Sequence, residues 1–545
     1  MSSLKTVLLG LLVLALLAPA AKAGKSINVD DPSLMKEAID FCNLQDEYDT
    51  IILTVPGGIY TTHDTMFYEI KKPLTIKAKE GLPEMPIITH SDDSSRVLEM
   101  FRVYNDLTLE GVILDGGGDF THGLKYGIRV GPSPDGSIMP KKGLKIIARN
   151  CIFRNFAQDK DIMKQGNAIY FLKNIPTVGK VEFENCRFEN ISDEAIRMTE
   201  TEKYKTERCL DTLIVRNSTF VNIGSECIRF YADTDDNTPD AYVLLEHLTI
   251  NNSATRVMYI KNNWGTIARD IVVTNSHLSV RRPDRNDFVI QIQKPTSVVS
   301  NVDTFNLVFG VPYEKRIGAT KGGTVDKATI WGFDPLYADA ANKDFTLLPG
   351  SHAYFSAHDG SALGDLRWAT NTPTVVPFTY EIQGGGSITF DPPLEGRCYD
   401  PGTVVTMTAV PDSGYAFAGW SGDVSGTDNP ATVTVNAATH VVATFQVATG
   451  VAEKGRMPLR YRLEQNYPNP FNPVTTVRFS LEKPGLTRLK IFSLLGSEVK
   501  TVLDGKLAAG EHTVQISAEG LPSGIYYYEL TSGTFRARRK MVVLK

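Results

Sequence analysis

The stretch RNCIFRN at residues 149–155 decides the fold, because it returns as ENCRFEN at 184–190 and as RNSTFVN at 216–222. Weaker copies are LEGVIL from Leu109, EHLTIN from Glu246 and TNSHLSV from Thr274. Alignment of the copies gives spacings of 40, 35, 32, 29 and 29 residues between Ile113, Phe153, Phe188, Phe220, Thr249 and Leu278. Each unit shows the alternation of strands without a helical period. A strand-only repeat of this length predicts a solenoid in which every turn stacks on the last.

An asparagine follows the strand in successive repeats. Asn155, Asn190, Asn222 and Asn251 share one phase of the repeat. Asparagine side chains can hydrogen-bond to one another when they stack, since each carries both donors and an acceptor. We therefore expect an amide ladder along one corner of the solenoid, where the backbone turns.

A second strand follows each asparagine turn, and its alternation predicts which side chains enter the core. The inward residues are Ile128, Ile169, Ile196, Ile228, Met258 and Ile290. Their neighbours Arg129, Tyr170, Arg197, Arg229, Tyr259 and Gln291 then point outward, and so do Leu172, Thr199, Tyr231, Lys261 and Gln293 two residues further on. Because adjacent strands lie about 4.8 Å apart, the outward residues should form ladders on one wall.

The repeat resembles that of right-handed parallel β-helix proteins of the pectate-lyase-like superfamily, over about residues 24–370. Near the start, Pro32 opens a short helix with an apolar face of Leu34, Ala38 and Phe41, as in the cap on the first coil of such proteins. Residues 334–353 are similar to the segment that closes many of them. A β-propeller is the structural alternative, although its blades are longer.

Two smaller modules follow the repeat. Residues 377–447 resemble a bacterial surface repeat of the InlB-B type, in which Trp420 and Phe417 are expected to form the core. Residues 448–460 are the expected linker. LEQNYPNPF at 463–471 begins a run of alternating strands that resembles the C-terminal sorting domain of the type IX secretion system, over 461–545. The expected fold is all-β: a right-handed parallel β-helix, a small β-rich repeat module and a C-terminal β-sandwich.

The N-terminus also predicts export. Lys5 precedes an apolar run from Val7 to Leu17, and Ala21-Lys22-Ala23 is a small-x-small cleavage pattern, so residues 1–23 are read as a signal peptide. We expect a secreted protein or one on the outer surface of a Gram-negative bacterium, with the type IX secretion machinery as a partner and no transmembrane segment after the signal is removed.

Charge and cysteine content exclude other classes. The net charge of −5 provides no general basic field, so a nucleic-acid partner is not expected. The six cysteines show neither zinc-ligand spacing nor the density of a disulfide framework. Cys151 and Cys186 share one phase of the repeat, and we expect them to pack in the core without a bond.

The outward row is the candidate functional surface. Stacked arginines repel one another unless an anion or interleaved carboxylates compensate. One interpretation is a groove for an acidic polysaccharide, with arginines binding carboxylates or sulfates and tyrosines stacking on sugar rings. Its expected substrate-binding residues are Arg129, Tyr170, Arg197, Tyr259 and Gln291. The alternative is a structural Arg–Glu network in which Glu194 and Glu226 neutralise the arginines.

SECIRFY at 225–231 resembles a stretch of alginate and chondroitin lyases of polysaccharide lyase family 6. The resemblance implies that Glu226 binds Ca²⁺, and we expect Glu194, one coil earlier, to share the ion and bridge it to the substrate carboxylate. The position of the family's catalytic lysine holds Tyr231, and that of its arginine, one coil on, holds Lys261. Tyr231, Lys261 and Arg229 are therefore the expected catalytic residues of a β-elimination, with Tyr231 as base or acid. A stacking or structural role for Tyr231 is the alternative.

Two other types of site are less well supported by the sequence. Asp233, Asp235, Asp236 and Asp240 follow Tyr231 but lack the motifs of β-helix hydrolases and of a complete calcium loop. His122, His247 and His277 have no serine or cysteine partner at a recognisable spacing and are expected to be structural or exposed. The sequence thus favours an exported β-helix that binds and cleaves an acidic polysaccharide. The competing class is a non-catalytic adhesin or glycan-binding solenoid.

Overall fold

The computed structural model describes residues 24–61, 67–90, 99–117, 124–157, 166–172, 175–199, 210–231, 241–254, 257–261, 265–276, 290–292, 297–305, 307, 317–319, 323–448, 461–471, 473–494 and 496–543. The expected signal peptide and nearly all of the expected linker lie outside these ranges. The chain divides into two compact units, Met1–Val447 and Ala448–Lys545.

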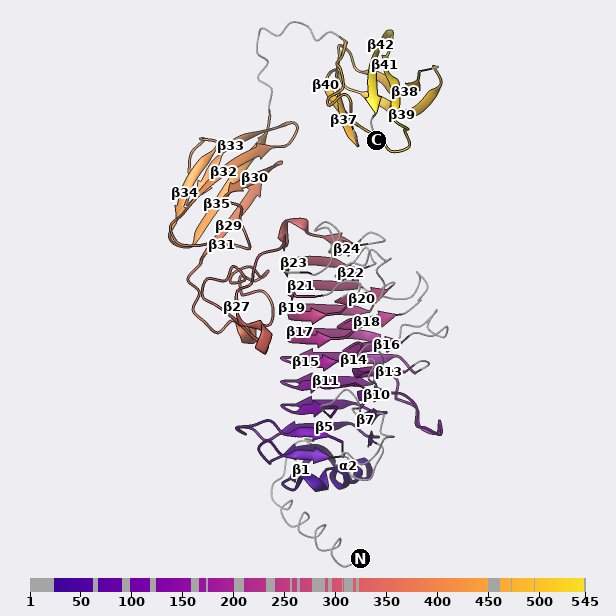
Figure 1. Ribbon diagram of the computed structural model, residues 1–545, viewed down its shortest axis with the longest axis vertical. Helices are drawn as coiled ribbons and strands as arrows, with labels where there is room; N and C mark the ends of the chain where they lie inside the picture. The colour runs from indigo at the N-terminus through magenta and orange to yellow at the C-terminus, as the bar shows by residue number, and fades with distance from the viewer. Residues whose placement is uncertain are drawn as a thin grey trace, which may run out of the picture. The chain divides into compact units, whose positions relative to one another are not determined.

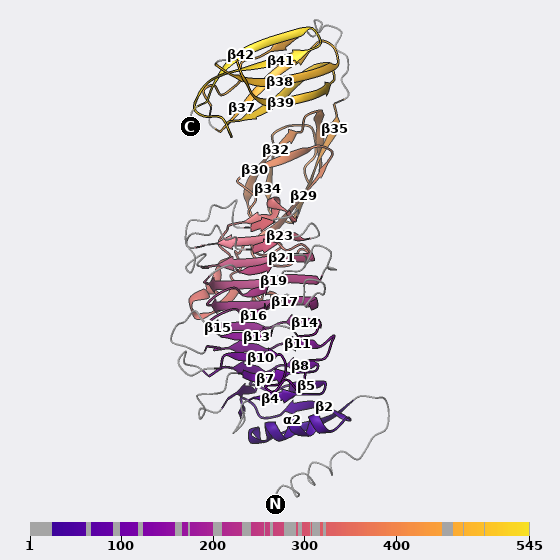
Figure 2. The ribbon, with the colours of Figure 1, turned by 90° about the vertical axis from the view of Figure 1, so that its right-hand side faces the viewer.

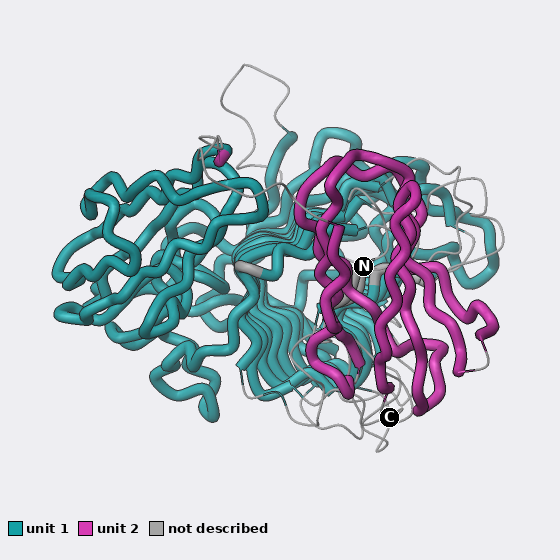
Figure 3. The backbone as a smooth tube through the Cα atoms, turned by 90° about the horizontal axis from the view of Figure 1, so that it is seen from above, with its two compact units in different colours: residues 1–447 teal, residues 448–545 magenta. Residues whose placement is uncertain are grey.

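The repeat folds as a parallel β-helix, as the sequence predicted (Figure 1). Within the described residues, strands of successive coils pair in parallel into a 17-stranded and a 9-stranded sheet. Seen from above, the coils lie over one another in unit 1 (Figure 3). The larger sheet supplies two walls of the solenoid and the smaller sheet supplies the third.

The first wall contains β1 (Lys25–Val29), β2 (Tyr48–Leu53), β5 (Leu74–Ala78), β8 (Leu107–Glu110), β11 (Lys145–Arg149) and β14 (Val178–Glu184). The second wall contains β3 (Ile59–Thr61), β6 (Ile87–Thr89), β9 (Ile113–Asp115), β12 (Ile152–Arg154) and β15 (Arg187–Ile191). The strands β17 (Leu210–Ile223), β19 (Tyr242–Ser253), β21 (Gly265–Thr274) and β23 (Val298–Phe305) run through both walls and are continued by β25 (Thr324–Val325) and β26 (Ile330–Trp331). The third wall contains β4 (Tyr68–Ile70), β7 (Glu99–Val103), β10 (Tyr126–Val130), β13 (Asn167–Phe171), β16 (Ile196–Thr199), β18 (Ile228–Tyr231), β20 (Met258–Lys261), β22 (Ile290–Ile292) and β24 (Ile317–Ala319) (Figure 2).

Two corners of the coils depend on residues in the left-handed backbone region. The first corner, between the first and second walls, has φ of 48° to 60° at Asn150, Asn185, Asn217, His247, Asp270 and Asn301. The second corner, after the second wall, has φ of 49° to 62° at Asn155, Asn190, Asn222, Asn252 and Asn275. Asparagine, aspartate and histidine are the side chains that adopt this conformation most readily after glycine. The recurring asparagines of the sequence therefore determine where each coil turns.

The second corner carries the predicted amide ladder. Asn190 Nδ2 donates to Asn155 Oδ1 at 3.1 Å, and Asn222 Nδ2 donates to Asn190 Oδ1 at 3.0 Å. The next rung is Asn252, which donates to Asn222 Oδ1 at 2.7 Å, so the prediction of Asn251 was wrong by one residue. Asn251 is instead buried and donates to Thr274 Oγ1.

The two weakest copies of the repeat were also misaligned in the sequence. Phe220 pairs in register with Ile250, and Ile250 with Val273, so these residues occupy the core position that Thr249 and Leu278 were expected to hold. The register gives spacings of 30 residues (250 − 220) and 23 residues (273 − 250). Thr249 was thus placed one residue from Ile250, an error that exchanges the inward and outward faces, and Leu278 was placed five residues from Val273 (278 − 273).

The core is continuous along the solenoid. Phe153, Phe188 and Phe220 stack from coil to coil, with ring centroids 5.0 and 4.6 Å apart. Cys151 and Cys186 are buried and free, which confirms that they pack without a bond. Because equivalent apolar residues of successive coils pack against one another, this stacking stabilises the whole column.

A short helix covers the first coil, as predicted. Asp31 accepts from Ser33 N–H at the start of the 3₁₀ turn η1 (Pro32–Leu34), which leads into α2 (Met35–Leu44). The buried face consists of Met35, Ala38, Ile39 and Cys42. Leu34 and Phe41 are only partly buried, so the expected apolar face was rotated relative to the observed one.

The segment after the last coil lies along the second wall rather than over the open end. Residues 334–368 include β27 (Tyr337–Asp339), β28 (Asp344–Leu347) and the 3₁₀ turn η6 (Leu366–Trp368) (Figure 1). We call residues 334–368 the covering segment. It touches four successive coils, through Asn190, Thr219, Thr249 and Asp270. The segment that the sequence identified after the last coil is therefore present, but it packs against the second wall and does not close the open end.

The next module, β29 (Val376–Gln383) to β35 (Thr439–Val447), is a small all-β domain. Trp420 is buried and its Nε1 donates to Asp428 O at 2.8 Å, while the ring of Phe417 lies 5.0 Å from it. These aromatics thus belong to the core, as expected. Arg397 ties this module to the solenoid by donating to Ala357 O and to Asn301 Oδ1.

Unit 2 contains two antiparallel sheets in its described part. One sheet has β36 (Arg462–Leu463), β37 (Val474–Leu481) and β40 (Gly510–Ser517), and the other has β38 (Gly485–Ser493), β39 (Glu498–Leu507), β41 (Gly524–Ser532) and β42 (Phe535–Val543). The motif at 463–471 is held by Tyr528, whose hydroxyl donates to Glu464 O and accepts from Asn466 N–H. The motif is therefore a structural part of the sandwich.

Asn190→Ala should lower the free energy of unfolding by about 2–3 kcal/mol, because two amide hydrogen bonds are lost and alanine is strained at φ 53°. Asn190→Gly should cost about 1 kcal/mol less, since glycine tolerates this φ. Urea denaturation followed by circular dichroism measures both. Equal losses in the two variants would show that the backbone conformation contributes nothing.

Candidate functional site

The third wall brings the predicted outward row together. Adjacent strands pair Arg129 with Tyr170, Tyr170 with Arg197, and Arg197 with Arg229. The row continues to Tyr259 and Gln291. The residues predicted to point inward, Ile128, Ile169, Ile196, Ile228, Met258 and Ile290, are all buried. The strand phase inferred from alternation is thus confirmed over six coils.

The row extends further toward the N-terminus than the sequence alignment reached. Arg129 pairs with Arg102 on β7, and Arg102 pairs with Glu69 on β4. The signal for Arg102 was present in the sequence, because Phe101 and Val103 flank it as buried apolar neighbours, as Ile128 and Val130 flank Arg129.

Glu194 neutralises two arginines of the row. Its side chain is fully buried just before β16, and one oxygen accepts from Arg229 at 2.6 Å while the other accepts from Arg197 at 3.1 Å. Arg197 also contacts Asp193 at 3.2 Å. Burial works to raise the pKa of Glu194, but the charges of Arg197 and Arg229 outweigh it and hold the pKa below its ordinary value. A buried carboxylate paired in this way fixes both guanidinium groups.

A second buried glutamate plays the same part at the start of the row. Glu99 forms ion pairs with Arg102 and, at 3.5 Å, with Arg129. Here burial is the larger effect, and it raises the pKa of Glu99 despite the two guanidinium groups. The described arginines of the row therefore all have carboxylate partners, which is the arrangement of the structural alternative.

The two glutamates expected to bind Ca²⁺ differ in what they offer. Both oxygens of Glu194 are already bonded to guanidinium groups, so a cation there would have to displace an arginine. Glu226 Oε2 accepts from Ser225 Oγ at 2.7 Å and lies 3.9 Å from Arg229 Nη1. Glu226 is thus the carboxylate with more remaining capacity for a cation.

Tyr170 of the row stacks on Tyr126, which lies three residues before Arg129 on β10. The rings of Tyr126 and Tyr170 lie 4.7 Å apart at an interplanar angle of 16°. Lys125 and Arg129 lie over the Tyr126 ring at 5.1 and 5.4 Å, and Arg197 lies over the Tyr170 ring at 5.6 Å. We call these five residues the tyrosine platform. Cations against aromatic faces keep the rings in place and add positive charge beside them.

Lys125, Arg129 and Arg197 place three positive charges around the two rings of the tyrosine platform. Partial burial, and after it the charges of Arg129 and Arg197, lower the pKa of Lys125. Arg129 Nε is buried without a hydrogen-bond partner among the described residues, and Arg129 Nη1 lies 3.5 Å from Glu99. The platform therefore combines the buried ring of Tyr126 and the half-buried ring of Tyr170 with three cationic side chains.

The expected catalytic pair is described only in its backbone. Tyr231 and Lys261 are register partners on β18 and β20, one row beyond Arg229 and Tyr259. Their side chains, and that of Gln291, lie outside the described residues, as do Gln293, His122, His277 and the four aspartates between 233 and 240. Their predicted roles remain predictions.

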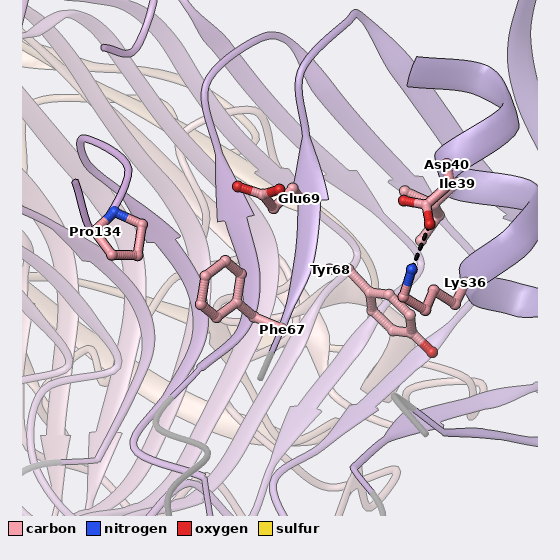
Figure 4. A pocket seen from close by; sticks show the side chains of 7 residues that line it. All are labelled: Lys36, Ile39, Asp40, Phe67, Tyr68, Glu69 and Pro134. Carbon is pink, nitrogen blue, oxygen red and sulfur yellow. Dashed lines mark hydrogen bonds and ion pairs between the residues drawn. The ribbon is translucent and has the colours of Figure 1, made fainter. Parts of the chain in front are cut away.

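A pocket opens at the N-terminal end of the third wall (Figure 4). It is lined by Lys36, Ile39, Asp40, Phe67, Tyr68, Glu69 and Pro134. Lys36 pairs with Asp40, and Glu69 pairs with Lys71 and accepts from Tyr104 Oη. The charged groups that line this pocket are thus engaged with one another or with neighbours, and they provide no free acid and base.

Comparison with known families identifies two domains in the C-terminal part of the chain. Residues 376–449 match the divergent InlB B-repeat domain, and residues 465–544 match the secretion system C-terminal sorting domain. Unit 2 is a type IX sorting domain. The protein is therefore exported by a bacterium and directed to the cell surface, in contact with the secretion machinery. Both matches confirm the resemblances seen in the sequence.

Neither family match reaches the β-helix, and no curated protein matches the chain. None of the described helices is long and apolar enough to cross a bilayer. The function of the solenoid must therefore be argued from its own walls.

Glu194→Gln should lower the free energy of unfolding by about 2 kcal/mol at pH 7, because it leaves two partly exposed guanidinium groups short of their buried carboxylate. The folded-state pKa of Glu194 is depressed, so its contribution is complete above about pH 4.3 and is lost as pH falls further. Urea midpoints measured between pH 3 and 6 should fall less steeply in the variant. Parallel curves for the variant and the wild type would contradict the assignment.

Proposed function

We propose that the solenoid is a surface-displayed binding domain for an anionic polysaccharide, held along the third wall with the tyrosine platform at its centre. The observation that carries this proposal is the stacked Tyr126–Tyr170 pair surrounded by three cations. The ring faces are occupied by one another and by the cations, so a sugar would contact the edge of the half-buried Tyr170, while guanidinium groups suit its carboxylates or sulfates.

The carboxylate partners of the arginines limit how such a ligand could bind. Arg197 and Arg229 are fixed by Glu194, so they are pre-positioned but largely neutralised. Arg129, whose carboxylate partner Glu99 lies at 3.5 Å, is the arginine of the row best able to attract an anion. A ligand with spaced single charges fits this pattern better than a densely charged polymer. A parallel wall also repeats its contacts every coil, which suits a polymer with a regular repeat.

Binding should depend on the platform and on ionic strength. With residues 24–545, affinity electrophoresis in gels containing polygalacturonate, alginate or chondroitin sulfate should show retardation that neutral dextran does not cause. Tyr170→Ala should weaken retention about tenfold, in proportion to the roughly 1.4 kcal/mol of a lost ring contact, and added salt should weaken it further.

The matched control is Arg149→Gln, which removes an ion-paired arginine from the first wall. It should leave retention unchanged. Failure of all three anionic polymers to bind, or equal losses in the two variants, would refute the assignment of the third wall.

Cleavage by β-elimination is a second candidate, supported by the register of Tyr231 with Lys261 beside Arg229 and Tyr259. Adjacent strands place such a pair of titratable residues within reach of one sugar. β-Elimination requires a base to remove the proton beside the carboxylate and an acid to protonate the leaving oxygen. Ca²⁺ at Glu226 would neutralise the substrate carboxylate in this candidate.

Cleavage is tested by the ultraviolet absorbance of unsaturated sugar ends during incubation with the same polymers. If the protein is a lyase, Tyr231→Phe should reduce the rate by at least about 100-fold, the usual value of a general acid or base. Tyr259→Phe, on the neighbouring strand, should retain most of the rate. Retained binding without any product would leave the protein a binding domain and exclude the lyase.

A further inference from the structure

A group of histidine and aspartate side chains gathers at the first corner, away from the third wall. This corner carries asparagine on the coils of β11, β14, β17 and β23. On the two coils between, the same left-handed position holds His247 on β19 and Asp270 on β21. The asparagine pattern is therefore broken on adjacent coils, and both replacements are side chains that bind metal ions.

His247 is a buried imidazole without a hydrogen bond. Its side chain is 6% exposed, and its Nδ1 has no partner in the described part of the chain. Its Nε2 faces Asp270 Oδ2 at 3.8 Å and Asp359 Oδ2 at 3.9 Å, both too far for a hydrogen bond. The buried Nδ1 stays unsatisfied, whereas Nε2, which faces the two carboxylates, is the nitrogen placed to bind a ligand.

The covering segment brings two more donors to His247. His358 approaches Asp270 twice, with its backbone N–H donating to Oδ1 at 2.8 Å and its Nδ1 lying 2.5 Å from Oδ2. Asp359 accepts from the backbone and hydroxyl of Ser361 through Oδ1 only, which leaves Oδ2 directed toward His247. Single donor atoms of His247, His358 and Asp359 lie within 4.8 Å of one another.

We propose that His247, His358 and Asp359 form a binding site for a divalent transition-metal ion, with Zn²⁺ the favoured ion and Asp270 orienting His358. Two imidazoles and a carboxylate are a set of ligands that Zn²⁺ prefers, whereas Ca²⁺ and Mg²⁺ prefer oxygen alone. A carboxylate bonded to the second nitrogen of a metal-binding histidine is the usual supporting contact.

Metal binding requires the three ligands to move closer together. Bonds of about 2.0–2.1 Å place tetrahedral zinc ligands roughly 3.3 Å apart, compared with 3.9 Å between His247 Nε2 and Asp359 Oδ2 and distances within 4.8 Å for the whole set. His358 and Asp359 belong to an exposed turn, so they can move toward the buried His247. Their exposure also leaves one coordination position open to water.

The ion would join the covering segment to the wall beneath it. His247 belongs to a coil, whereas His358 and Asp359 lie about 110 residues later in the segment. Nearby contacts of the segment are single hydrogen bonds, such as Gly364 N–H to Asp270 O and Asp365 N–H to Thr249 Oγ1. A metal ion at this site would hold the covering segment against the wall. This effect does not depend on a polysaccharide bound at the third wall.

The test uses the untagged chain of residues 24–545, treated with chelator, dialysed and titrated with ZnCl₂ by isothermal calorimetry, with bound zinc counted by atomic spectroscopy. We expect one Zn²⁺ per chain and an increase in the melting temperature. His247→Asn should lose at least tenfold in affinity. This variant restores the residue found at the same corner on other coils, so it should fold. Asp359→Asn, at a half-exposed carboxylate, should show the same loss.

His352→Gln is the matched control, because it removes a half-buried imidazole from the same segment without touching the cluster. It should bind Zn²⁺ like the wild type. Any heat measured on titration with CaCl₂ should be the same for the wild type and for His247→Asn. The proposal is overturned if the wild type binds no zinc after dialysis, or if His247→Asn and Asp359→Asn retain the wild-type affinity and stoichiometry.

Discussion

The left-handed turn at the corners is the constraint on which the rest of the solenoid depends. At each such corner the coil bends from one wall to the next at a single residue, and only a few side chains adopt that backbone conformation without strain. Asparagine also bonds to its copy on the next coil, as from Asn190 to Asn155, so the same residue both turns the chain and sets the register. With the register fixed, inward and outward residues follow from alternation, and the rows of the third wall follow with them.

The parallel fold and the strand phase could be predicted because they depend on local, repeated signals. Apolar alternation and recurring asparagines located the core at Ile128 and its equivalents. The prediction failed where a copy was weak: Asn251 and Thr249 were each assigned one residue from the true position. It also could not locate contacts between distant segments. His247 appeared isolated because its neighbours His358 and Asp359 are contributed by the covering segment.

The three walls differ in what they leave exposed, and this separates their functions. The second wall is occupied by the covering segment, which uses Thr219, Thr249 and the corner at Asp270. The third wall keeps its charged row at the surface, but buried glutamates restrain the arginines. The sequence already offered Glu194 and Glu226 as partners that neutralise the arginines, and in the structure Glu194 pairs with both Arg197 and Arg229. Selectivity for a ligand would then depend on the few cations that remain under-compensated.

The path of the covering segment has a mechanical consequence for a protein held at the cell surface through its C-terminal end. The chain leaves the last coil at Trp331, reaches the coil of Asn190 at Lys343, returns to Asp270 at His358, and reaches the coil of Cys186 again at Arg367. Tension from the anchor would load these lateral bonds in shear across several coils at once. The terminal coil is thereby spared from being peeled off alone.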